Sequence, residues 1–170
     1  MLTGLAPLVS TQTRLLILGS FPGVASLKAQ QYYGHPRNHF WPILSAIFGC
    51  SPDNTGAESY EKRSNWFLGN QLGVWDVYAS CEREGSLDSA IQAAKLNDFS
   101  RLQQLCPNLQ AIAHNGGESF KHSAHTRLLG LPVYKLPSTS PANASWSFER
   151  KLAAWRGVCA KHGLPDNASP

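Results

Sequence analysis

Four short runs of apolar, strand-forming residues, separated by longer stretches of helical character, constrain the fold of this chain more than any other feature. The runs occupy residues 14–18 (RLLIL), 74–78 (VWDVY), 109–114 (LQAIAH) and 133–136 (VYKL). Strands that alternate with helices are typical of parallel sheets, because the chain must cross over between neighbouring strands. The pattern predicts an α/β fold with a short, mainly parallel four-stranded sheet, in one domain over residues 1–170.

The intervals between these runs carry the signals of helices. Apolar spacing or capping residues predict helices over residues 40–48, 57–72, 86–92, 97–105, 118–129 and 148–158. Gly49 is expected to stop the first of them, and Ser86, Asn97 and Ser147 are candidate N-terminal caps. Residues 19–39 are predicted to form a long loop, and the tail beyond Gly163 is expected to fray.

Composition excludes several classes of protein. Charged residues make up 15% of the chain and hydrophobic residues 42%, which is typical of a globular protein. A run of about 20 apolar residues, which a membrane span needs, is absent from the sequence. Because the N-terminus also lacks a secretory signal pattern, we expect a cytoplasmic location. The net charge of +4 permits an acidic partner such as nucleic acid but does not require one.

The cysteines and histidines do not follow the spacing of a metal site. The cysteines are widely separated, without a C-x-x-C pair, and are expected to be buried free thiols: Cys50, Cys81, Cys106 and Cys159. The histidines His35, His39, His114, His122 and His125 match no H-E-x-x-H or closed His/Cys pattern. We therefore expect no metal site.

Unusual residues follow the ends of all four predicted strands. GSFPG comes after the first, Asp76 lies near the end of the second, HNGG follows the third and LPSTSPAN follows the fourth. In open α/β sheets, ligands bind beyond the carboxyl ends of the strands, where such loops meet. We therefore expect these four segments to form one binding site.

Each segment also has a simpler explanation. GSFPG is consistent with an ordinary turn, and it matches neither a P-loop nor G-x-G-x-x-G. HNGG is consistent with a helix start, although N–H groups there favour a phosphate. PSTSPANAS is consistent with a solvent loop or with hydroxyl contacts to phosphates. Asp76 is harder to explain in this way, because a buried carboxylate without a partner is costly.

The ordered set GSFPG, QYY, HPRN-x-FW, WDV, GSLD, NDF, NG and LPSTSPAN resembles the hypoxanthine-DNA (DNA-deoxyinosine) glycosylase branch of the uracil-DNA glycosylase superfamily, from about Leu15 to Trp155. The resemblance implies a three-layer α/β/α sandwich without a cofactor. It also implies a monomeric, monofunctional enzyme of base excision repair that hydrolyses the N-glycosidic bond of a deaminated base in DNA. Hypoxanthine is the favoured base, with uracil or a mismatched pyrimidine as alternatives. Such an enzyme must rotate its target nucleotide out of the helix.

The resemblance also assigns roles to residues, with two departures from the superfamily pattern. Phe21 stands where many relatives carry a water-positioning Asp or Asn, so Asn38 of HPRN is the candidate catalytic residue. Leu136 replaces a histidine that stabilises the departing base in some relatives, so other donors, such as backbone N–H groups of the first loop, must do this. Asp76 is expected to accept a hydrogen bond from N1–H of hypoxanthine or N3–H of uracil.

Two further groups complete the predicted site. The base-binding group, in which Phe21 or Phe40 stacks on the flipped ring, comprises Gly19, Ser20, Phe21, Phe40, Asp76 and Asn115. The group that contacts DNA phosphates or carries a wedge comprises Gly23, Ser26, His35, Arg37, Ser138, Thr139, Ser140 and Asn143. The wedge itself is expected within residues 141–146. Lys28 and Lys135 are expected to be solvated or to face phosphates rather than to form a Schiff base.

Two other functions remain as alternatives. The absence of the usual acid in the first motif leaves room for a non-catalytic module that binds damaged DNA or a nucleotide on the same fold. A small-molecule hydrolase that uses Ser138 or Ser20 is the third hypothesis, but the chain has no G-x-S-x-G elbow.

Overall fold

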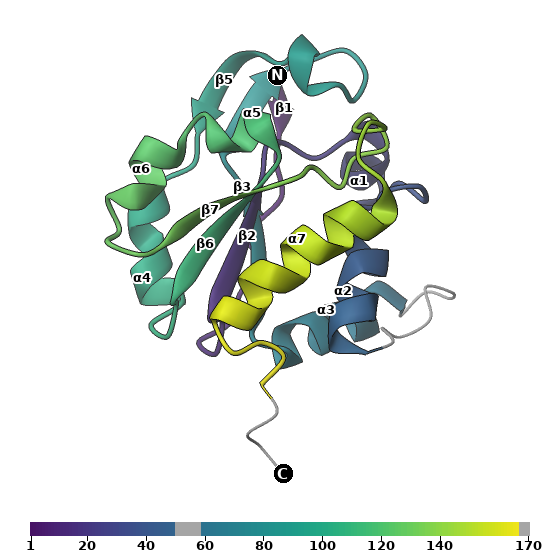
Figure 1. Ribbon diagram of the computed structural model, residues 1–170. Coiled ribbons are helices and arrows are strands. Elements are labelled where there is room, and N and C mark those ends of the chain that lie inside the picture. The colour runs from purple at the N-terminus through teal and green to yellow at the C-terminus, as the bar shows by residue number, and fades with distance from the viewer. Residues whose placement is uncertain (50–58, 167–170) are drawn as a thin grey trace.

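A parallel sheet forms the centre of the computed structural model, which describes residues 1–49 and 59–166 (Figure 1). Its strands lie in the order β3-β2-β6-β7, and all neighbouring pairs are parallel. Their bounds are β2 (Leu15–Gly19), β3 (Leu72–Asp76), β6 (Ala111–Asn115) and β7 (Val133–Leu136). The predicted four-stranded parallel sheet is therefore confirmed. Every residue of the first three of these strands is buried, as expected for strands covered on both faces.

Helices cover both faces of this sheet and make three layers. One face packs against α2 (Phe40–Phe48), α3 (Ser59–Gly69) and α7 (Phe148–Lys161), and α4 (Leu102–Leu105) and α6 (Ser123–Arg127) lie on the opposite side (Figure 1). Alternate residues of β2 point to the two layers, because side chains of a strand alternate between its faces. Buried apolar side chains form two core clusters. The first contains Leu15 and Ile17 with residues of α2, α3 and α7, and the second contains Leu16 and Leu18 with residues of α4.

The first core cluster also positions the loop that follows β7. Trp155 of α7 is almost fully buried, and its ring meets that of Phe40 edge to face, with centroids 6.0 Å apart. Its indole Nε1 donates a hydrogen bond of 3.1 Å to the carbonyl oxygen of Pro137. Truncating such a side chain costs about 3–5 kcal/mol. Core packing thus holds the backbone of the PSTS segment in place.

A small antiparallel sheet was not predicted from the sequence. It has the strand order β1-β4-β5, with β1 (Leu2–Thr3), β4 (Tyr78–Glu82) and β5 (Gln92–Leu96). The predicted helix over residues 86–92 is wrong: only a short 3-10 turn, η1 (Asp88–Ala90), forms before β5. The single strand predicted at 74–78 is two strands, since β3 ends at Asp76 and β4 begins at Tyr78. Pairing with β4 overrides the helix-forming composition of β5 (QAAKL).

Several boundaries differ from the sequence expectations. The predicted long loop contains α1 (Val24–Ala29), and the helix expected over 118–129 is divided into α5 (Gly117–Phe120) and α6. The side chain of Asp98, rather than that of Asn97, accepts the N–H of Ser100 at the start of η2 (Phe99–Arg101). The predicted cap of α7 is confirmed, because Ser147 Oγ accepts the N–H of Arg150 at 3.2 Å.

The end of the described chain is packed rather than frayed. Leu164 is buried in the first core cluster, and Asp166 forms an ion pair of 3.3 Å with Arg14. The prediction of fraying is therefore wrong for residues 164–166, and residues 167–170 lie outside the described part. Cys81, Cys106 and Cys159 are buried free thiols, as predicted, whereas Cys50 and the first two residues of the helix predicted over 57–72 lie outside the described residues. In the described part, no helix is both long and apolar enough to cross a membrane.

Candidate active site

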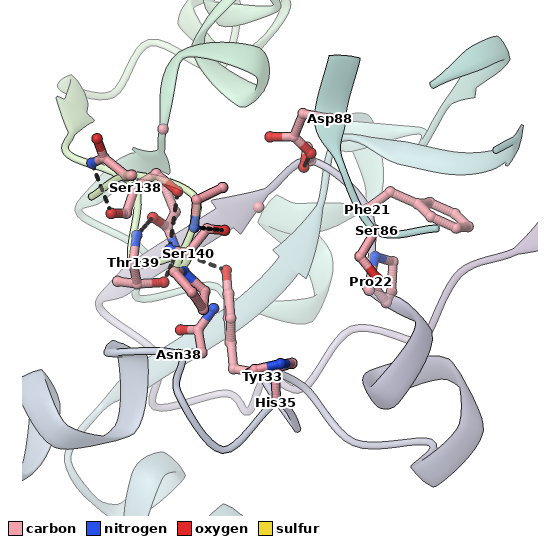
Figure 2. A pocket seen from close by; sticks show the side chains of 18 of the residues that line it. Phe21, Pro22, Tyr33, His35, Asn38, Ser86, Asp88, Ser138, Thr139 and Ser140 are labelled. Carbon is pink, nitrogen blue, oxygen red and sulfur yellow. Dashed lines mark hydrogen bonds between the residues drawn. The ribbon is translucent and has the colours of Figure 1, made fainter. Parts of the chain in front are cut away.

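A cavity of about 970 Å³ opens at the carboxyl ends of the parallel strands (Figure 2). Its volume is within the range of small-molecule sites, about 300–1,000 Å³. The lining comes from all four of the predicted segments, together with parts of three others, within residues 19–26, 32–38, 76, 86–89, 115–117, 135–146 and 154. Figure 2 shows Tyr33 and Asn38 beside the segment 138–140, with Phe21, Ser86 and Asp88 farther across the cavity. The structure thus brings the predicted strand-end segments together.

Close packing between β2 and β3 positions the carboxyl group of Asp76. Gly19 and Asp76 are paired in register at the ends of these strands. A Cβ atom at position 19 would lie 2.5 Å from Asp76 Oδ1 and 2.9 Å from the hydroxyl of Tyr33. Glycine is therefore required at the start of GSFPG because these side chains approach the backbone closely.

The carboxyl group of Asp76 is strongly perturbed by its surroundings. Only 4% of the residue is exposed, and Oδ2 has no hydrogen-bond partner among the described residues. Burial raises the pKa of Asp76 to about 7; the nearby Asp88 carboxyl adds to the rise, and the guanidinium of Arg83 opposes it. A buried group without a partner, in a cavity, is a candidate for ligand binding.

Asn38 lines the cavity just before α2 begins. Its side-chain Oδ1 accepts the backbone N–H of Phe40 at 2.9 Å, and the backbone N–H of Asn38 donates to the carbonyl oxygen of His35 at 3.0 Å. The first bond identifies Oδ1, since only an oxygen can accept an N–H, and it fixes the side chain in an Asx turn. A carboxamide oxygen has two lone pairs and its nitrogen has two hydrogens, so Asn38 can still bind and orient a water molecule.

The amide of Asn115 connects three segments of the site. Its Nδ2 donates to the Tyr33 hydroxyl and to Thr139 Oγ1, each at 3.0 Å, and its Oδ1 accepts the N–H of Thr139 at 3.0 Å. Both amide hydrogens are therefore used within the protein. Thr139 lines the cavity but is fully buried, and its Oγ1 accepts a hydrogen bond from Asn115, so the phosphate contact of Thr139 stays a prediction.

The aromatic wall differs from the prediction. Phe40 is fully buried and does not line the cavity, so its predicted stacking on a ligand is wrong. Its ring instead stacks on that of Tyr33, with centroids 4.0 Å apart and planes 19° apart. Tyr33, which does line the cavity, was missed, although the QYY segment contains it. Phe21 lines the cavity as predicted, with the guanidinium of Arg83 5.3 Å from the centre of its ring.

Hydroxyl and amide groups line the side formed by the loop after β7. Ser138 Oγ accepts the N–H of Ser140 at 3.1 Å, and Asn143 Nδ2 donates to the Ser138 carbonyl at 3.0 Å. Both serines and Asn143 line the cavity. Gly116 has a left-handed backbone, with φ of +97°, and a Cβ there would lie 3.0 Å from that of Ser138. The left-handed glycine of HNGG thus leaves room for Ser138.

Other predicted contact residues have different surroundings. Gly23, Ser26 and His35 line the cavity, but Ser26 is buried and its Oγ accepts the N–H of Gly34 at 2.9 Å. Arg37 is exposed and lines a neighbouring hollow instead. Lys135 lies on the cavity wall, whereas Lys28 does not line it.

The segment 86–89 forms a wall that the sequence analysis missed, because the GSLD motif was interpreted as a helix. Ser20 Oγ donates to Asp88 Oδ1 at 2.6 Å, and the N–H of Val24 donates to Ser86 Oγ at 2.9 Å. These bonds hold the segment over the GSFPG loop. Leu87 remains 58% exposed at the cavity.

His114 is a structural residue of β6. It is fully buried, and its ring nitrogens pair with the hydroxyls of Ser119 at 2.8 Å and Thr126 at 2.9 Å. Burial lowers the pKa of His114 to about 4, so the ring is neutral at pH 7. Within residues 1–49 and 59–166, no group of three or more His, Cys, Asp or Glu side chains could hold a metal ion.

Comparisons with known proteins agree with this geometry. The profile of the uracil DNA glycosylase superfamily matches residues 6–158. A protein of Methanosarcina barkeri named hypoxanthine DNA glycosylase is 36% identical over 152 residues, which are 89% of this chain and 94% of the relative. A protein of the same name from Methanosarcina acetivorans is 37% identical over 155 residues, 91% of this chain and 96% of the relative.

A solved structure is also similar. The solution NMR structure of a Methanosarcina acetivorans protein, described as a uracil DNA glycosylase, superposes with a TM-score of 0.78 at 34% identity, over 92% of this chain and 97% of that one. The agreement of sequence and fold over nearly the whole length shows that the chain belongs to the uracil DNA glycosylase superfamily.

Proposed function

We propose that this protein is a monofunctional DNA glycosylase that rotates a deaminated base out of DNA and hydrolyses its N-glycosidic bond, with hypoxanthine as the preferred base. The observation that carries the proposal is the unpaired, buried carboxyl of Asp76 in a cavity walled by Phe21 and Tyr33. The two relatives named hypoxanthine DNA glycosylase support the choice of base.

Asp76 is the proposed reader of the base. As a carboxylate it accepts N1–H of hypoxanthine or N3–H of uracil, and it repels adenine or cytosine, which present a lone pair at that position. Because the pKa of Asp76 is about 7, its carboxyl group carries a proton near and below neutral pH. Only in that range does this proton compete with the hydrogen-bond donor of the base. Gly19 leaves the space that this carboxyl occupies.

Ring stacking is the second proposed contribution to binding. Tyr33 presents a ring whose orientation is fixed by the stack on Phe40 and by the hydrogen bond from Asn115. Phe21 provides a second ring in the same cavity. Stacking is worth about 1–3 kcal/mol per base, which offsets part of the cost of unpairing.

Asn38 is the proposed catalytic residue. A neutral amide cannot deprotonate water strongly, but it can hold one in position to trap an oxocarbenium-like sugar. The bond from the N–H of Phe40 keeps the amide oriented for this role. Leu136 is buried, so we assign stabilisation of the departing base to backbone N–H groups of the GSFPG loop.

The remaining contacts are assigned to the DNA backbone. We propose that Ser138, Ser140 and Asn143 bind the phosphates next to the flipped nucleotide, with His35 and the backbone at Gly23 as further contacts. The loop 141–146 is the proposed wedge. Lys135 is assigned to phosphate binding rather than to a Schiff base with the sugar. The enzyme should therefore have no lyase activity and should leave the strand at an abasic site uncleaved.

A panel of labelled duplexes tests the function. Inosine, xanthine, and uracil opposite each base are incubated with the protein in EDTA, and abasic sites are scored by alkaline cleavage. We expect free base from the inosine duplex without metal, and strand breaks only after alkali. Binding to these duplexes without release of any base would contradict the proposal and favour the non-catalytic DNA-binding module.

We also propose that the protein acts as a monomer in the cytoplasm. Light scattering coupled to size exclusion should give the mass of one chain, with and without bound DNA. A mass of two chains would contradict the first part, and fractionation of cells would test the second.

A further inference from the structure

A second hollow, of about 520 Å³, adjoins the active-site cavity, and its lining residues other than Asn38 and those of the loop 141–146 have no assigned role. The two share Asn38 and Asn143, together with Pro141 and Trp146. The remaining lining residues of the second hollow are Pro36, Arg37, His39, Pro42, Ala144 and Lys151. No Asp or Glu is among these described lining residues, whereas Arg37 and Lys151 are cations. The hollow therefore suits an anion.

Lys151 of α7 is a buried cation at the base of this hollow. Only 1% of the residue is exposed, and its Nζ lies 3.2 Å from His39 Nδ1 and 3.5 Å from the carbonyl oxygen of Ser140. An ammonium has three donors, and these two contacts use two of them. A charge that is out of contact with water is costly unless it is paired, so an incoming anion would gain from the third donor.

Lys151 also sets the protonation of His39. An ammonium cannot accept a hydrogen bond, so Nδ1 of His39 must be the acceptor and the ring carries its proton on Nε2. Burial lowers the pKa of His39, and the charge of Lys151 lowers it further, while Glu149 opposes the shift. The ring is held edge to face against Phe148, with centroids 5.2 Å apart. His39 is thus a fixed, neutral N–H donor.

The wall of the hollow is apolar beside these donors. Trp146 lies between the two hollows, and the guanidinium of Arg150 lies 4.2 Å from the centre of its indole ring. Prolines at 36, 42 and 141 line the rest. Cations next to an apolar surface match a phosphate that is attached to a sugar better than they match a free inorganic ion.

We propose that the second hollow binds one phosphodiester group of the substrate strand, outside the flipped nucleotide, through Lys151, His39 and Arg37. The inference rests on the proposed function, since the strand whose nucleotide enters the first cavity must continue past its rim. It adds a specific phosphate site to the serine contacts. The competing explanation is that Lys151 only connects α7 to His39 and to the loop carbonyl of Ser140.

A scan with methylphosphonate linkages separates these explanations. Duplexes contain a tetrahydrofuran abasic analogue, so that binding, measured by fluorescence anisotropy, does not require base release. One phosphate at a time is made neutral, over several linkages on each side of the analogue. For the wild type, one linkage outside those next to the analogue should weaken binding about tenfold when it is neutral, as expected for a charge-assisted hydrogen bond.

The variant Lys151→Met should bind the unmodified duplex about tenfold more weakly and lose its sensitivity to that one linkage. Lys161→Met is the matched control, because Lys161 is exposed on the same helix, where its Nζ lies over the ring of Tyr134. This control should keep full sensitivity to the linkage. If Lys151→Met retains the same sensitivity as the wild type at every linkage, the proposal is overturned and Lys151 is only structural.

Arg37→Gln keeps the test decisive if Lys151→Met does not fold. Arg37 is exposed, so its replacement should leave the melting temperature unchanged. In this variant, neutralising the same linkage should weaken DNA binding less than it does in the wild type. The slope of log affinity against log salt should also become shallower by about one. If either result is absent, the proposal is overturned. Base release from an inosine duplex is measured on the same samples. Linkage sensitivity without base release would refute the glycosylase and keep the phosphate site.

Discussion

The two sides of the active-site cavity differ in charge and in how they are held. On the strand side, Asp76 ends a buried strand and Asp88 lies near it, so this side is acidic. On the loop side, Ser138 and Ser140 lie with Lys135 on the wall and with the buried Lys151 behind them. The proposed base reader is thus separated from the proposed phosphate contacts. The acidic side faces the N–H donor of the base, and the basic side faces the anionic phosphates.

The means of support differ as well. Asp76 is positioned by the backbone ladder between β2 and β3 and by close packing on Gly19. The loop side is instead tied down by side chains: Asn115 to Thr139, Trp155 to Pro137 and Lys151 to Ser140. A change on the strand side should therefore alter which base is removed, whereas one on the loop side should alter how tightly DNA is bound.

The largest effect is expected where the two sides meet, at Asn38. Asn38→Ala removes the oriented amide, so base release from an inosine duplex should fall about 10²-fold or more while DNA affinity changes little. Single-turnover rates and anisotropy measure the two quantities. Asn70→Ala is the control, since that side-chain amide lies outside the cavity and donates to the Trp66 carbonyl near the end of α3. A normal rate for Asn38→Ala would show that another residue positions the water.

A smaller effect is expected for Asp76→Asn, which tests the strand side alone. The carboxamide offers a donor or an acceptor where the wild type offers a charged acceptor, so kcat/KM for inosine should fall about 10- to 100-fold. DNA affinity should be unchanged. Rates on inosine and on undamaged adenine duplexes give the selectivity, because a carboxylate accepts N1–H of hypoxanthine and repels the N1 lone pair of adenine. If Asp76→Asn keeps the wild-type preference for inosine over adenine, Asp76 does not read the base.

The pair Gly19→Ala and Gly73→Ala separates steric damage to the sheet from damage to the site. Both added methyl groups overlap neighbours, Asp76 Oδ1 at 2.5 Å in the first variant and Thr13 Cγ2 at 2.7 Å in the second. Urea unfolding should show both destabilised by about 1–3 kcal/mol. Only Gly19→Ala should also slow base release, because it displaces the Asp76 carboxyl. If Gly73→Ala slows base release as much as Gly19→Ala does, general damage to the sheet explains the loss, and the position of the Asp76 carboxyl does not.

The pH dependence of stability tests the environment of Asp76. Its pKa is raised to about 7 in the folded protein, so the folded state keeps this proton while the unfolded chain loses it near pH 4. Asp76 thus lowers the free energy of unfolding as pH rises from 4 to 7. His114, whose pKa is lowered to about 4, acts in the opposite direction between pH 4 and its ordinary value of about 6.5.

Urea unfolding of the wild type and of Asp76→Asn, from pH 4.5 to 8.5, isolates the contribution of Asp76, because His114 is present in both. The stability of the wild type relative to the variant should decline up to about pH 7 and then become constant. A difference in stability that does not change with pH would mean that folding does not raise the pKa of the Asp76 carboxyl.

The smallest effect is expected on the loop side. Ser138→Ala removes one neutral hydroxyl contact to a phosphate, which is worth about 0.5–1.5 kcal/mol, so DNA affinity should fall severalfold. The preference for inosine over adenine should not change, in contrast to Asp76→Asn. A change in that preference would show that the two sides are not independent.

The sequence was sufficient to predict the parallel sheet and the place of the site. Apolar runs that are buried on both faces are recognisable without a structure, and the carboxyl ends of parallel strands necessarily meet at one edge. The same reasoning failed for β5, whose residues are all exposed, because only pairing with β4 makes that segment a strand. Because residues 86–92 were predicted as a helix, the cavity wall formed by residues 86–89 was also not predicted.

Within the site, residue types were foreseen better than their surroundings. Tyr33 and Phe40 are both aromatic residues of neighbouring motifs, and only packing determines that Phe40 fills the core while Tyr33 lines the cavity. Lys151 is one of several basic residues in α7, and the contacts with His39 and Ser140 that bury it come from distant parts of the chain. Local patterns specify strands, turns and available chemistry. Burial, protonation and hydrogen-bond saturation depend on the sum of distant neighbours, which only the tertiary structure brings together.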